Sequence, residues 1–330
     1  MTEKKVTIKD VAKASGVSIA TVSQIVNGNS KNFSPKTVAK VLKIKDELNY
    51  VPDYFARRMV MKKSKTIGVL VPDISNPFFS TLVRGVEDVL YKENFITMLC
   101  NANGDNEKES LVLEELSRRG VDGFIIASSA ISDEDIERLL INKKHPFIIL
   151  DQKSSEENSD SIQTDDFLGG NLAASHLKEL GHEKVAVVLP EKATANIVRR
   201  LEGFIEVMGK NVTVIYSSLS KEGGRRAAKD IITTDVTGIF AINDEIAFGL
   251  YLGLKDFDKS IPGDYSVVGY DNVDMCKYVT PPLTTIAQPI YELGQQTAEM
   301  LLERIEHPKQ EQVIKKLPVN LINRFSTRQI

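Results

Sequence analysis

From Thr66 onward the chain repeats one pattern, in which a short run of β-branched and other apolar residues precedes a segment of helical character. Such runs are typical of strands buried in a parallel sheet, with helices as the crossover connections. Nine of them occur, at residues 66–72, 95–103, 121–129, 145–152, 184–190, 212–218, 237–244, 265–272 and 283–289. We therefore predict an α/β fold with two doubly wound parallel sheets, which would hold a ligand at the carboxyl ends of their strands.

Polar and aromatic side chains follow several of these strands, and an arginine precedes the segment Leu-Glu-Gly-Phe. The set consists of Asn76, Phe78, Phe79, Asp151, Arg200, Asn243, Asp271 and Gln288. A sugar ring can stack its apolar C–H face on an aromatic ring, and its hydroxyl groups can pair with carboxylate, amide and guanidinium groups. Taken singly, an Asp at a strand end usually caps the next helix, and a Phe pair is usually core. The convergence of the whole set predicts a ligand site.

The sequence offers no motif for a nucleotide cofactor or a metal ion. GxGxxG does not follow the first strand, and GxxxxGK[ST] does not occur. Cys100 and Cys276 lack ligand spacing, so we expect reduced, buried thiols. The four histidines are also scattered: they are His145, His176, His182 and His307. A hydrolase would recruit Asp151 and Asp271 as paired carboxylates, but nothing supplies an activated nucleophile. We predict no cofactor, no metal site and no enzymatic activity.

The first 65 residues differ from the rest in charge. They carry 14 Lys and Arg against 5 Asp and Glu, a net charge of +9, so the remaining residues carry −12 of the total of −3. The small N-terminal part is therefore suited to polyanions. Three short amphipathic helices are expected in it, the second capped by Ser18 and the third begun by Ser34 and Pro35. Their expected buried residues are Ile8, Val11, Ala12, Val22, Ile25, Val26, Val38, Val41, Leu42 and Leu48.

Three such helices form a helix-turn-helix unit, whose second helix would present Ile19, Ala20, Ser23 and Gln24 to base edges. The alternative is an amphipathic helix pair packed on the main body. The segments TIKDVAKASGVSIATVSQIVNG, SPKTVAKV and LNYVPDYFARRM closely resemble the headpiece of the LacI/GalR family of bacterial transcription regulators. The resemblance covers essentially all of residues 6–60, and later segments extend it to the C-terminus.

This resemblance implies two kinds of contact with double-stranded DNA. The residues implied to contact phosphate groups are Thr7, Ser18, Thr21, Ser23, Asn27 and Tyr50. The residues implied to read the major groove are Ile19, Ala20 and Gln24. Only the second set carries sequence information, because phosphate contacts position the protein without distinguishing bases. Many family members have Arg where this chain has Gln24. Since Arg favours guanine and Gln favours adenine, we expect an altered half-site preference.

The remainder of the chain resembles the effector domain of the same family and the periplasmic sugar-binding proteins related to it. The motifs that look especially like the ribose-binding members are NPFF, the Asp151 turn, RxxGF at 200–204, AIND, VVGYDN and TIAQ. Gln152 departs from the pattern, because ribose binders commonly have Arg there. Counting Asp151 and Asp271 against Arg200 gives a net negative pocket, which favours a neutral sugar over a sugar phosphate.

Residues 51–63 connect these two parts. Pro52 ends the preceding helix, and Asp53 can cap a helical run that is too short to be stable alone in water. By resemblance, this run would fold as a pair when a dimer binds DNA. Ala56 and Met59 would then face the minor groove, with Met59 at the position where relatives usually insert Leu as a wedge.

The expected organisation is a headpiece (residues 1–50), a hinge (51–64) and a sensor (65–330). In the family pattern the sensor has two lobes, about 65–163 with 290–321 and about 164–289 with 322–330, joined by crossings near residues 163, 289 and 321. The amphipathic segment 292–306 would return to the first lobe. The lobes are expected to close around a ligand, and a homodimer implies a palindromic operator.

We therefore predict a DNA-binding repressor of carbohydrate metabolism genes that leaves its operator when a neutral sugar, with ribose as first choice, binds the sensor. Three alternatives stay open: another sugar or a nucleoside as effector, a corepressor mode, and a sugar-binding transport protein. The sequence does not reveal the operator, the regulated genes or whether a phosphocarrier protein takes part. Without an apolar segment suited to a signal peptide or a membrane span, a cytoplasmic protein without membrane contact is expected.

Overall fold

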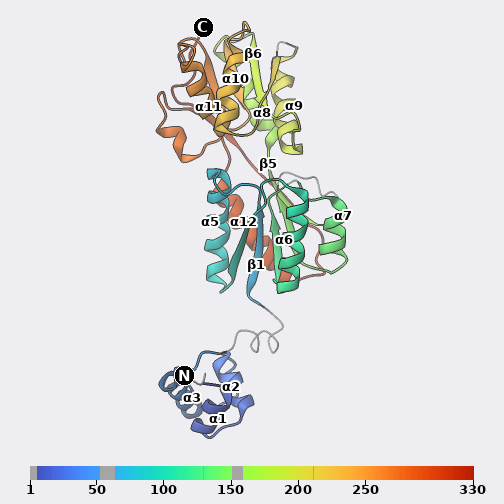
Figure 1. Ribbon diagram of the computed structural model, residues 1–330, viewed down its shortest axis with the longest axis vertical. Helices are drawn as coiled ribbons and strands as arrows, with labels where there is room; N and C mark the ends of the chain where they lie inside the picture. The colour runs from blue at the N-terminus through green and yellow to red at the C-terminus, as the bar shows by residue number, and fades with distance from the viewer. Residues whose placement is uncertain (1–5, 53–63, 129, 151–158, 211) are drawn as a thin grey trace. The chain divides into compact units, whose positions relative to one another are not determined.

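The computed structural model describes residues 6–52, 64–128, 130–150, 159–210 and 212–330. The chain divides into two compact units, Met1–Ser64 and Lys65–Ile330 (Figure 1). Among the helices in the described ranges, none is both long enough and apolar enough to cross a membrane.

The headpiece forms the three predicted helices, α1 (Ile8–Ser15), α2 (Ile19–Val26) and α3 (Pro35–Glu47). Capping fixes where two of them begin. The Ser18 hydroxyl accepts a hydrogen bond from Thr21 N at 3.0 Å, and the Ser34 hydroxyl accepts one from Thr37 N at 3.2 Å. α1 ends at Gly16, whose φ of 69° is a left-handed conformation that glycine adopts readily. Local sequence signals therefore determine the boundaries of this unit.

A small core holds the three helices together. Its buried members are Val11, Ala12, Val22, Ile25, Val41 and Tyr50. The prediction that Leu42 is buried is wrong, because its side chain is 39% exposed. A helix turns by about 100° per residue. Leu42 therefore points away from the stripe formed by Val38, Val41 and Leu48, which packs on the other two helices.

Within the described residues, the sensor forms two six-stranded sheets. Sheet A has the strand order β11 (Ile314–Leu317), β5 (Asp160–Thr164), β4 (Phe147–Leu150), β3 (Gly123–Ile126), β1 (Thr66–Val71), β2 (Ile96–Asn101). Sheet B has the order β12 (Asn320–Ile322), β10 (Thr284–Ala287), β9 (Ser266–Asp271), β8 (Gly238–Ala241), β6 (Val185–Leu189), β7 (Val212–Tyr216). All pairings are parallel except that of β10 with β12. We call the part built on sheet A lobe 1 and the part built on sheet B lobe 2.

All nine predicted strands are present, and β5, β11 and β12 add to them. The expectation of burial is confirmed for the central strands but is wrong for β2 and β7. These are edge strands, in which Ile96 is 70% exposed and Tyr216 is 62% exposed. β11 has the sequence Ile-Lys-Lys-Leu, and its first three residues are exposed, which explains why it gave no apolar run to predict.

Helices flank both sheets (Figure 1). Those of lobe 1 are α5 (Pro77–Lys92), α6 (Asn106–Arg119), α7 (Asp133–Ile136) with its π-helical continuation Glu137–Ile141, and α12 (Ile290–Glu306). Those of lobe 2 are α8 (Asp166–Glu179), α9 (Ala195–Met208), α10 (Lys221–Ile231) and α11 (Asp244–Lys255). A short 3-10 helix, η2 (Asp274–Lys277), follows β9.

α12 lies beside α5, although the two are far apart in sequence. A Cβ added at Gly294 would lie 2.1 Å from the Leu82 carbonyl oxygen, and one at Gly85 would lie 2.2 Å from the Tyr291 carbonyl oxygen. Both positions therefore need glycine for the two backbones to approach so closely.

The chain passes between the sheets after β5, after β10 and between β11 and β12. The third crossing lies between Leu317 and Asn320. It comes before the expected position near residue 321, because Asn320–Ile322 already pairs with β10 in sheet B. Three closely spaced crossings bring the strand ends of the two lobes together.

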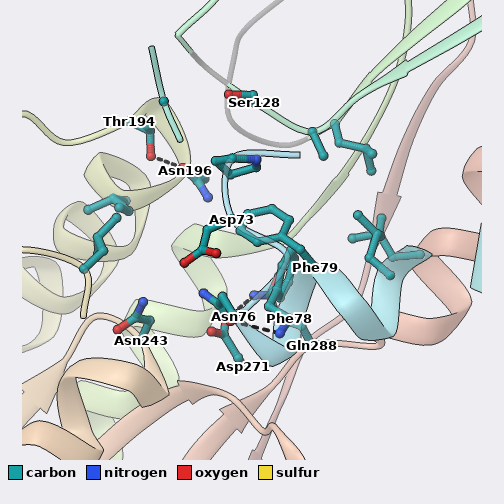
Figure 2. A pocket seen from close by; sticks show the side chains of 18 of the residues that line it. Asp73, Asn76, Phe78, Phe79, Ser128, Thr194, Asn196, Asn243, Asp271 and Gln288 are labelled. Carbon is teal, nitrogen blue, oxygen red and sulfur yellow. Dashed lines mark hydrogen bonds between the residues drawn. The ribbon is translucent and has the colours of Figure 1, made fainter. Parts of the chain in front are cut away.

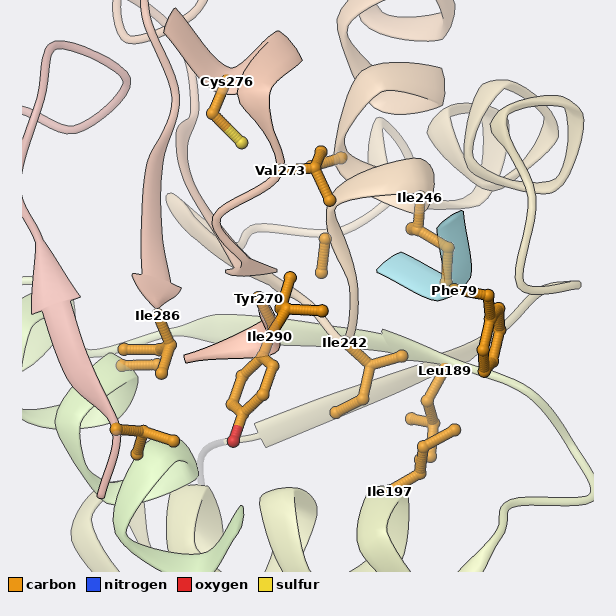
Figure 3. Packing of buried hydrophobic residues seen from close by; sticks show 14 of the residues in the cluster. Phe79, Leu189, Ile197, Ile242, Ile246, Tyr270, Val273, Cys276, Ile286 and Ile290 are labelled. Carbon is orange, nitrogen blue, oxygen red and sulfur yellow. The ribbon is translucent and has the colours of Figure 1, made fainter. Parts of the chain in front are cut away.

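Buried apolar side chains support these strand ends in lobe 2. Figure 3 shows Ile242, Tyr270 and Ile286 in this layer, at the ends of β8, β9 and β10. Tyr270 is fully buried, and its hydroxyl donates to Asp166 Oδ1 at 3.1 Å. The layer therefore carries a polar group toward the start of α8.

Candidate functional site

A cavity of about 240 Å³ lies between the lobes, at the carboxyl ends of strands from both sheets (Figure 2). Seven of the nine predicted ligand residues line it: Asn76, Phe78, Phe79, Arg200, Asn243, Asp271 and Gln288. The other two, Asp151 and Gln152, lie outside the described residues. The rule that ligands bind at strand ends of doubly wound sheets thus identified residues that meet in one place.

Lobe 1 contributes an aromatic pair at the start of α5. The rings of Phe78 and Phe79 lie edge to face, with centroids 5.0 Å apart and an angle of 82° between their planes. Phe79 is buried in the core, whereas Phe78 is half-buried. Phe78 is therefore the ring with surface left for a ligand, and Phe79 supports it.

Two asparagines in the cavity also cap helices. Asn76 Oδ1 accepts a hydrogen bond from Phe78 N at 2.9 Å at the start of α5. Asn243 Oδ1 accepts one from Ile246 N at 2.9 Å at the start of α11. Because each cap uses the amide oxygen, each residue can offer its Nδ2 group to a ligand. Capping and ligand binding are therefore compatible at both positions.

Arg200 reaches the cavity from α9 and is buried. Its Nε donates to Asp166 Oδ1 at 2.7 Å, its Nη1 donates to the Ile242 carbonyl oxygen at 2.9 Å, and its guanidinium lies 3.7 Å from the centroid of the Tyr270 ring. Burial alone would lower the pKa of Arg200, but Asp166, Tyr270 and Asp271 outweigh it and raise the pKa above its ordinary value. The group therefore stays charged, with its plane fixed by three neighbours.

Asp271 ends β9 with a φ of 118°, a conformation that is unusual for a residue with a side chain. Its Oδ1 accepts a hydrogen bond from Gln288 Nε2 at 2.7 Å, and Gln288 Oε1 accepts one from Thr164 Oγ1 at 2.8 Å. Burial raises the pKa of Asp271 well above its ordinary value. Asp244 and Asp166 add to the rise, and Arg200 opposes it.

Asp244 lies behind Asp271 and is fully buried. Its carboxylate accepts hydrogen bonds from Val273 N at 2.9 Å, Thr285 Oγ1 at 2.7 Å and Cys276 Sγ at 3.0 Å. Burial raises the pKa of Asp244 to about 6, and these hydrogen bonds oppose the rise. The loop after β9 is thus tied to α11 and β10.

The predicted charge count of the pocket was incomplete, because it left out Asp73, which lines the cavity, and Asp166, which pairs with Arg200. The Asp166 carboxylate neutralises Arg200, which is the single Lys or Arg among the described residues that line the cavity. A negatively charged ligand group would therefore meet no unpaired cation in the described part of the site.

Sequence reasoning missed four further polar residues that line the cavity: Asp73, Ser128, Thr194 and Asn196. Asp73 and Ser128 follow β1 and β3, so the strand-end rule could have found them. The Ser128 hydroxyl donates to the buried Glu109 carboxylate. Thr194 and Asn196 lie at the start of α9, which no strand-end signal marks, and the Thr194 hydroxyl donates to Asn196 Oδ1.

In the headpiece, the residues expected to read bases lie on the surface. Ile19 is 45% exposed, and Ala20 and Gln24 are also exposed. Several residues expected to contact phosphate have internal partners as well: Thr7 and Ser18 cap helices, the Thr21 and Ser18 hydroxyls are 2.9 Å apart, and Asn27 Nδ2 donates to Ser23 Oγ at 3.4 Å. Tyr50 lies in the headpiece core. Ala56 and Met59 lie outside the described residues.

The cysteines and histidines take no part in the cavity lining. Cys276 is buried and Cys100 is half-buried, and both are free thiols. His176 lies 2.9 Å from the Thr327 hydroxyl, and His182 lies 2.8 Å from the Thr237 hydroxyl. Across the described ranges, no group of three or more His, Cys, Asp or Glu residues is arranged to hold a metal ion.

Two family models match the chain. Residues 7–53 match the bacterial regulatory proteins of the lacI family, and residues 174–327 match a periplasmic binding protein-like domain. The HTH-type transcriptional repressor PurR of Photobacterium profundum is 34% identical over 333 residues, which cover 98% of this chain and 99% of that protein.

Comparison with solved structures also identifies LacI-type regulators as similar proteins. A LacI family transcriptional regulator from Enterococcus faecalis V583 with bound ribose is 59% identical, covers 80% of this chain and 99% of that one, and has a TM-score of 0.78. A lac repressor dimer bound to operator and an anti-inducer is 28% identical, covers 98% of this chain and 100% of that one, and has a TM-score of 0.87. The chain belongs to the LacI family of DNA-binding transcriptional repressors, which are not enzymes, and its sensor matches the periplasmic binding protein-like domain.

Proposed function

We propose that this protein is a ribose-responsive repressor, which binds a palindromic operator as a homodimer and is released when ribose enters the cavity of the sensor. The observation that carries the proposal is the meeting of a half-buried aromatic ring with amide, carboxylate and guanidinium groups in one cavity. The regulator from Enterococcus faecalis with bound ribose, 59% identical, supports the choice of sugar.

The chemistry of the cavity suits a small neutral polyol. Asp271 can accept hydrogen bonds from sugar hydroxyls, and Asn76 and Asn243 can donate to them through Nδ2. Phe78 can stack on the apolar face of the ring. Arg200 still has Nη2, which makes no hydrogen bond to another described residue.

The proposed division of the chain is a DNA-binding headpiece (1–50), a hinge (51–64) and a two-lobed sensor (65–330), and the protein would act in the cytoplasm on chromosomal DNA. Ile19, Ala20 and Gln24 would read the major groove. The sugar can act only if it binds better to a sensor conformation that holds DNA less well, because the two ligands must differ in their preferred state.

A second candidate is a purine or nucleoside effector. The PurR proteins match 98% of this chain at about one-third identity, whereas the regulator with bound ribose matches 80% at 59% identity. The higher identity favours ribose. A purine effector could act in the opposite direction and tighten DNA binding, as a corepressor.

The test is an operator mobility shift with the full chain, titrated with ribose, other neutral sugars, ribose 5-phosphate, a purine base and a purine nucleoside. Ribose is expected to release the operator. Asp271→Asn should weaken this release, whereas Asp274→Asn, at an exposed ion pair with Lys277, serves as the matched control and should not. Tighter binding in the presence of the purine base, with no effect of ribose, would replace the proposal by the second candidate.

The headpiece assignment has its own test, a binding-site selection that compares the wild type with Gln24→Arg. Because Gln pairs with adenine and Arg with guanine, the preferred base should change at one position in each half-site. Gln24 is exposed, so the free energy of unfolding should stay the same. An unchanged selection at every position would contradict the placement of Gln24 against a base.

A further inference from the structure

Thr164 lies where the segments that join the lobes come together. It is the last residue of β5, and it pairs with Leu317, the last residue of β11, across the edge of sheet A. Its hydroxyl donates to Gln288 Oε1 at 2.8 Å, and Gln288 follows β10. Thr164 therefore touches both of the other segments that cross between the lobes, through its backbone register and its side chain.

The contact with Gln288 continues into the cavity. Gln288 Nε2 donates to Asp271 Oδ1 at 2.7 Å. Thr164 is 2% exposed, Gln288 6% and Asp271 5%, so water has little access to any member of this chain of hydrogen bonds. Because Thr164 Oγ1 donates a hydrogen bond to the amide oxygen of Gln288, the amide nitrogen of Gln288 faces the carboxylate of Asp271.

Residues next to Thr164 reach other parts of the same region. Asp165 accepts a hydrogen bond from Leu168 N at 3.1 Å and pairs with Lys316 of β11 at 2.8 Å. Asp166 holds Arg200. Three consecutive residues on the first crossing thus contact both other crossings and fix two ligand residues, although Thr164 itself does not line the cavity.

From these contacts we infer that Thr164 is a positioning residue of the sugar site, which acts through Gln288 to hold Asp271 in the orientation that receives the sugar. The inference rests on the proposed function. It deepens the proposed function by making the affinity for ribose depend on a hydroxyl at the first crossing between the lobes, on a residue that does not line the cavity.

Three full-length variants test the inference by calorimetry with ribose. Thr164→Val keeps the shape but removes the donor, which leaves the buried Gln288 amide free to turn, and ribose should bind about tenfold more weakly. Thr164→Ser keeps the hydroxyl and should bind ribose nearly as the wild type does. Thr213→Val, on the edge strand β7, is the matched control and should change nothing.

Sugar-free measurements separate positioning from a general structural effect. Operator affinity without sugar should be the same for the wild type and Thr164→Val, because the backbone pairing of Thr164 with Leu317 does not depend on the side chain. Equal ribose affinity in the wild type and Thr164→Val would overturn the inference while leaving the proposed function standing. Equal losses of ribose affinity in Thr164→Val and Thr164→Ser would also overturn it, because the serine variant keeps the hydroxyl and would then gain nothing from it. If the wild type binds no ribose, the proposed function and this inference both fail.

Discussion

Lobe 1 and lobe 2 contribute different chemistry to the cavity they share. Lobe 1 presents Phe78, Asn76 and Asp73, which are partly or fully exposed in this structure. Lobe 2 presents Arg200 and Asp271, which are buried and already hydrogen-bonded to other side chains. These three side chains of lobe 1 are thus accessible to solvent, whereas the two charged groups of lobe 2 lie in the interior of their lobe.

This difference indicates how the free energy of binding is divided. The cost of burying Arg200 is met when lobe 2 folds, because Asp166 and the Ile242 carbonyl oxygen compensate it. A ligand then finds these groups preorganised and need not order them. In lobe 1 the ligand must instead replace water around a half-buried ring, so closure of the lobes adds its contribution at the moment of binding.

The largest expected effect is on the buried charges of lobe 2. Arg200→Met would leave Asp166 buried without its cation, and removing one partner of a buried ion pair typically costs about 3–5 kcal/mol. Urea unfolding of the full chain should show this loss, and calorimetry should show no ribose binding. Arg199→Met, at the exposed neighbouring position, is the control. Similar stability of the two variants would mean that lobe 2 does not depend on this ion pair.

An intermediate effect should appear in the pH dependence of stability. Burial raises the pKa of Asp244 from 3.8 to about 6, so between pH 4 and 6 the folded state keeps a proton that the unfolded state has released. The free energy of unfolding therefore falls as the pH rises through this window, by about 2 kcal/mol, and stays lower above it. An asparagine at this position does not titrate, so Asp244→Asn should show a smaller fall, to which Asp271, whose pKa burial also raises, still contributes.

The pH dependence of the free energy of unfolding must be compared between the wild type and Asp244→Asn, because lobe 2 also contains buried histidines. Burial lowers the pKa of His176 and of His182, so their contribution to stability falls as the pH drops below 6.5, which is the opposite sign. Both histidines are present in both proteins, and their contribution cancels in the difference. Parallel curves for the wild type and Asp244→Asn would show that Asp244 has no raised pKa.

The smallest expected effect concerns lobe 1. Phe78→Ala should weaken ribose binding by about 1 kcal/mol, because a stacking face is lost. It should change the free energy of unfolding much less than Arg200→Met does, since Phe78 is only half-buried. Phe257→Ala, at a 40% exposed position in lobe 2, is the matched control for ribose affinity. A large loss of stability in Phe78→Ala would remove the contrast between the lobes.

The sequence predicted the features that depend on short-range signals. Ser18 and Ser34 mark helix starts because a cap is formed with the backbone three residues later. The strand ends were predicted because parallel strands place their carboxyl ends at one edge of a sheet. Asn76, Asn243, Asp271 and other cavity residues followed from that rule.

Features that depend on distant partners were not predicted. Asp166 pairs with Arg200 across 34 positions and lies at the start of α8, where an Asp is ordinarily a helix-capping residue. The register of β11 with β5 joins residues about 150 positions apart, and the strand is too polar to signal itself. The burial of Asp244 depends on packing of β9, β10 and η2, which no local pattern encodes.

The close contact between α5 and α12 has a consequence for how the protein is made. Gly85 and Gly294 are about 200 positions apart, so lobe 1 cannot assemble its full set of helices until most of the chain has left the ribosome. The headpiece, held by contacts within its first 50 residues, has no such delay. During each round of synthesis the DNA-binding unit is therefore complete first, and the part that responds to a ligand is complete last.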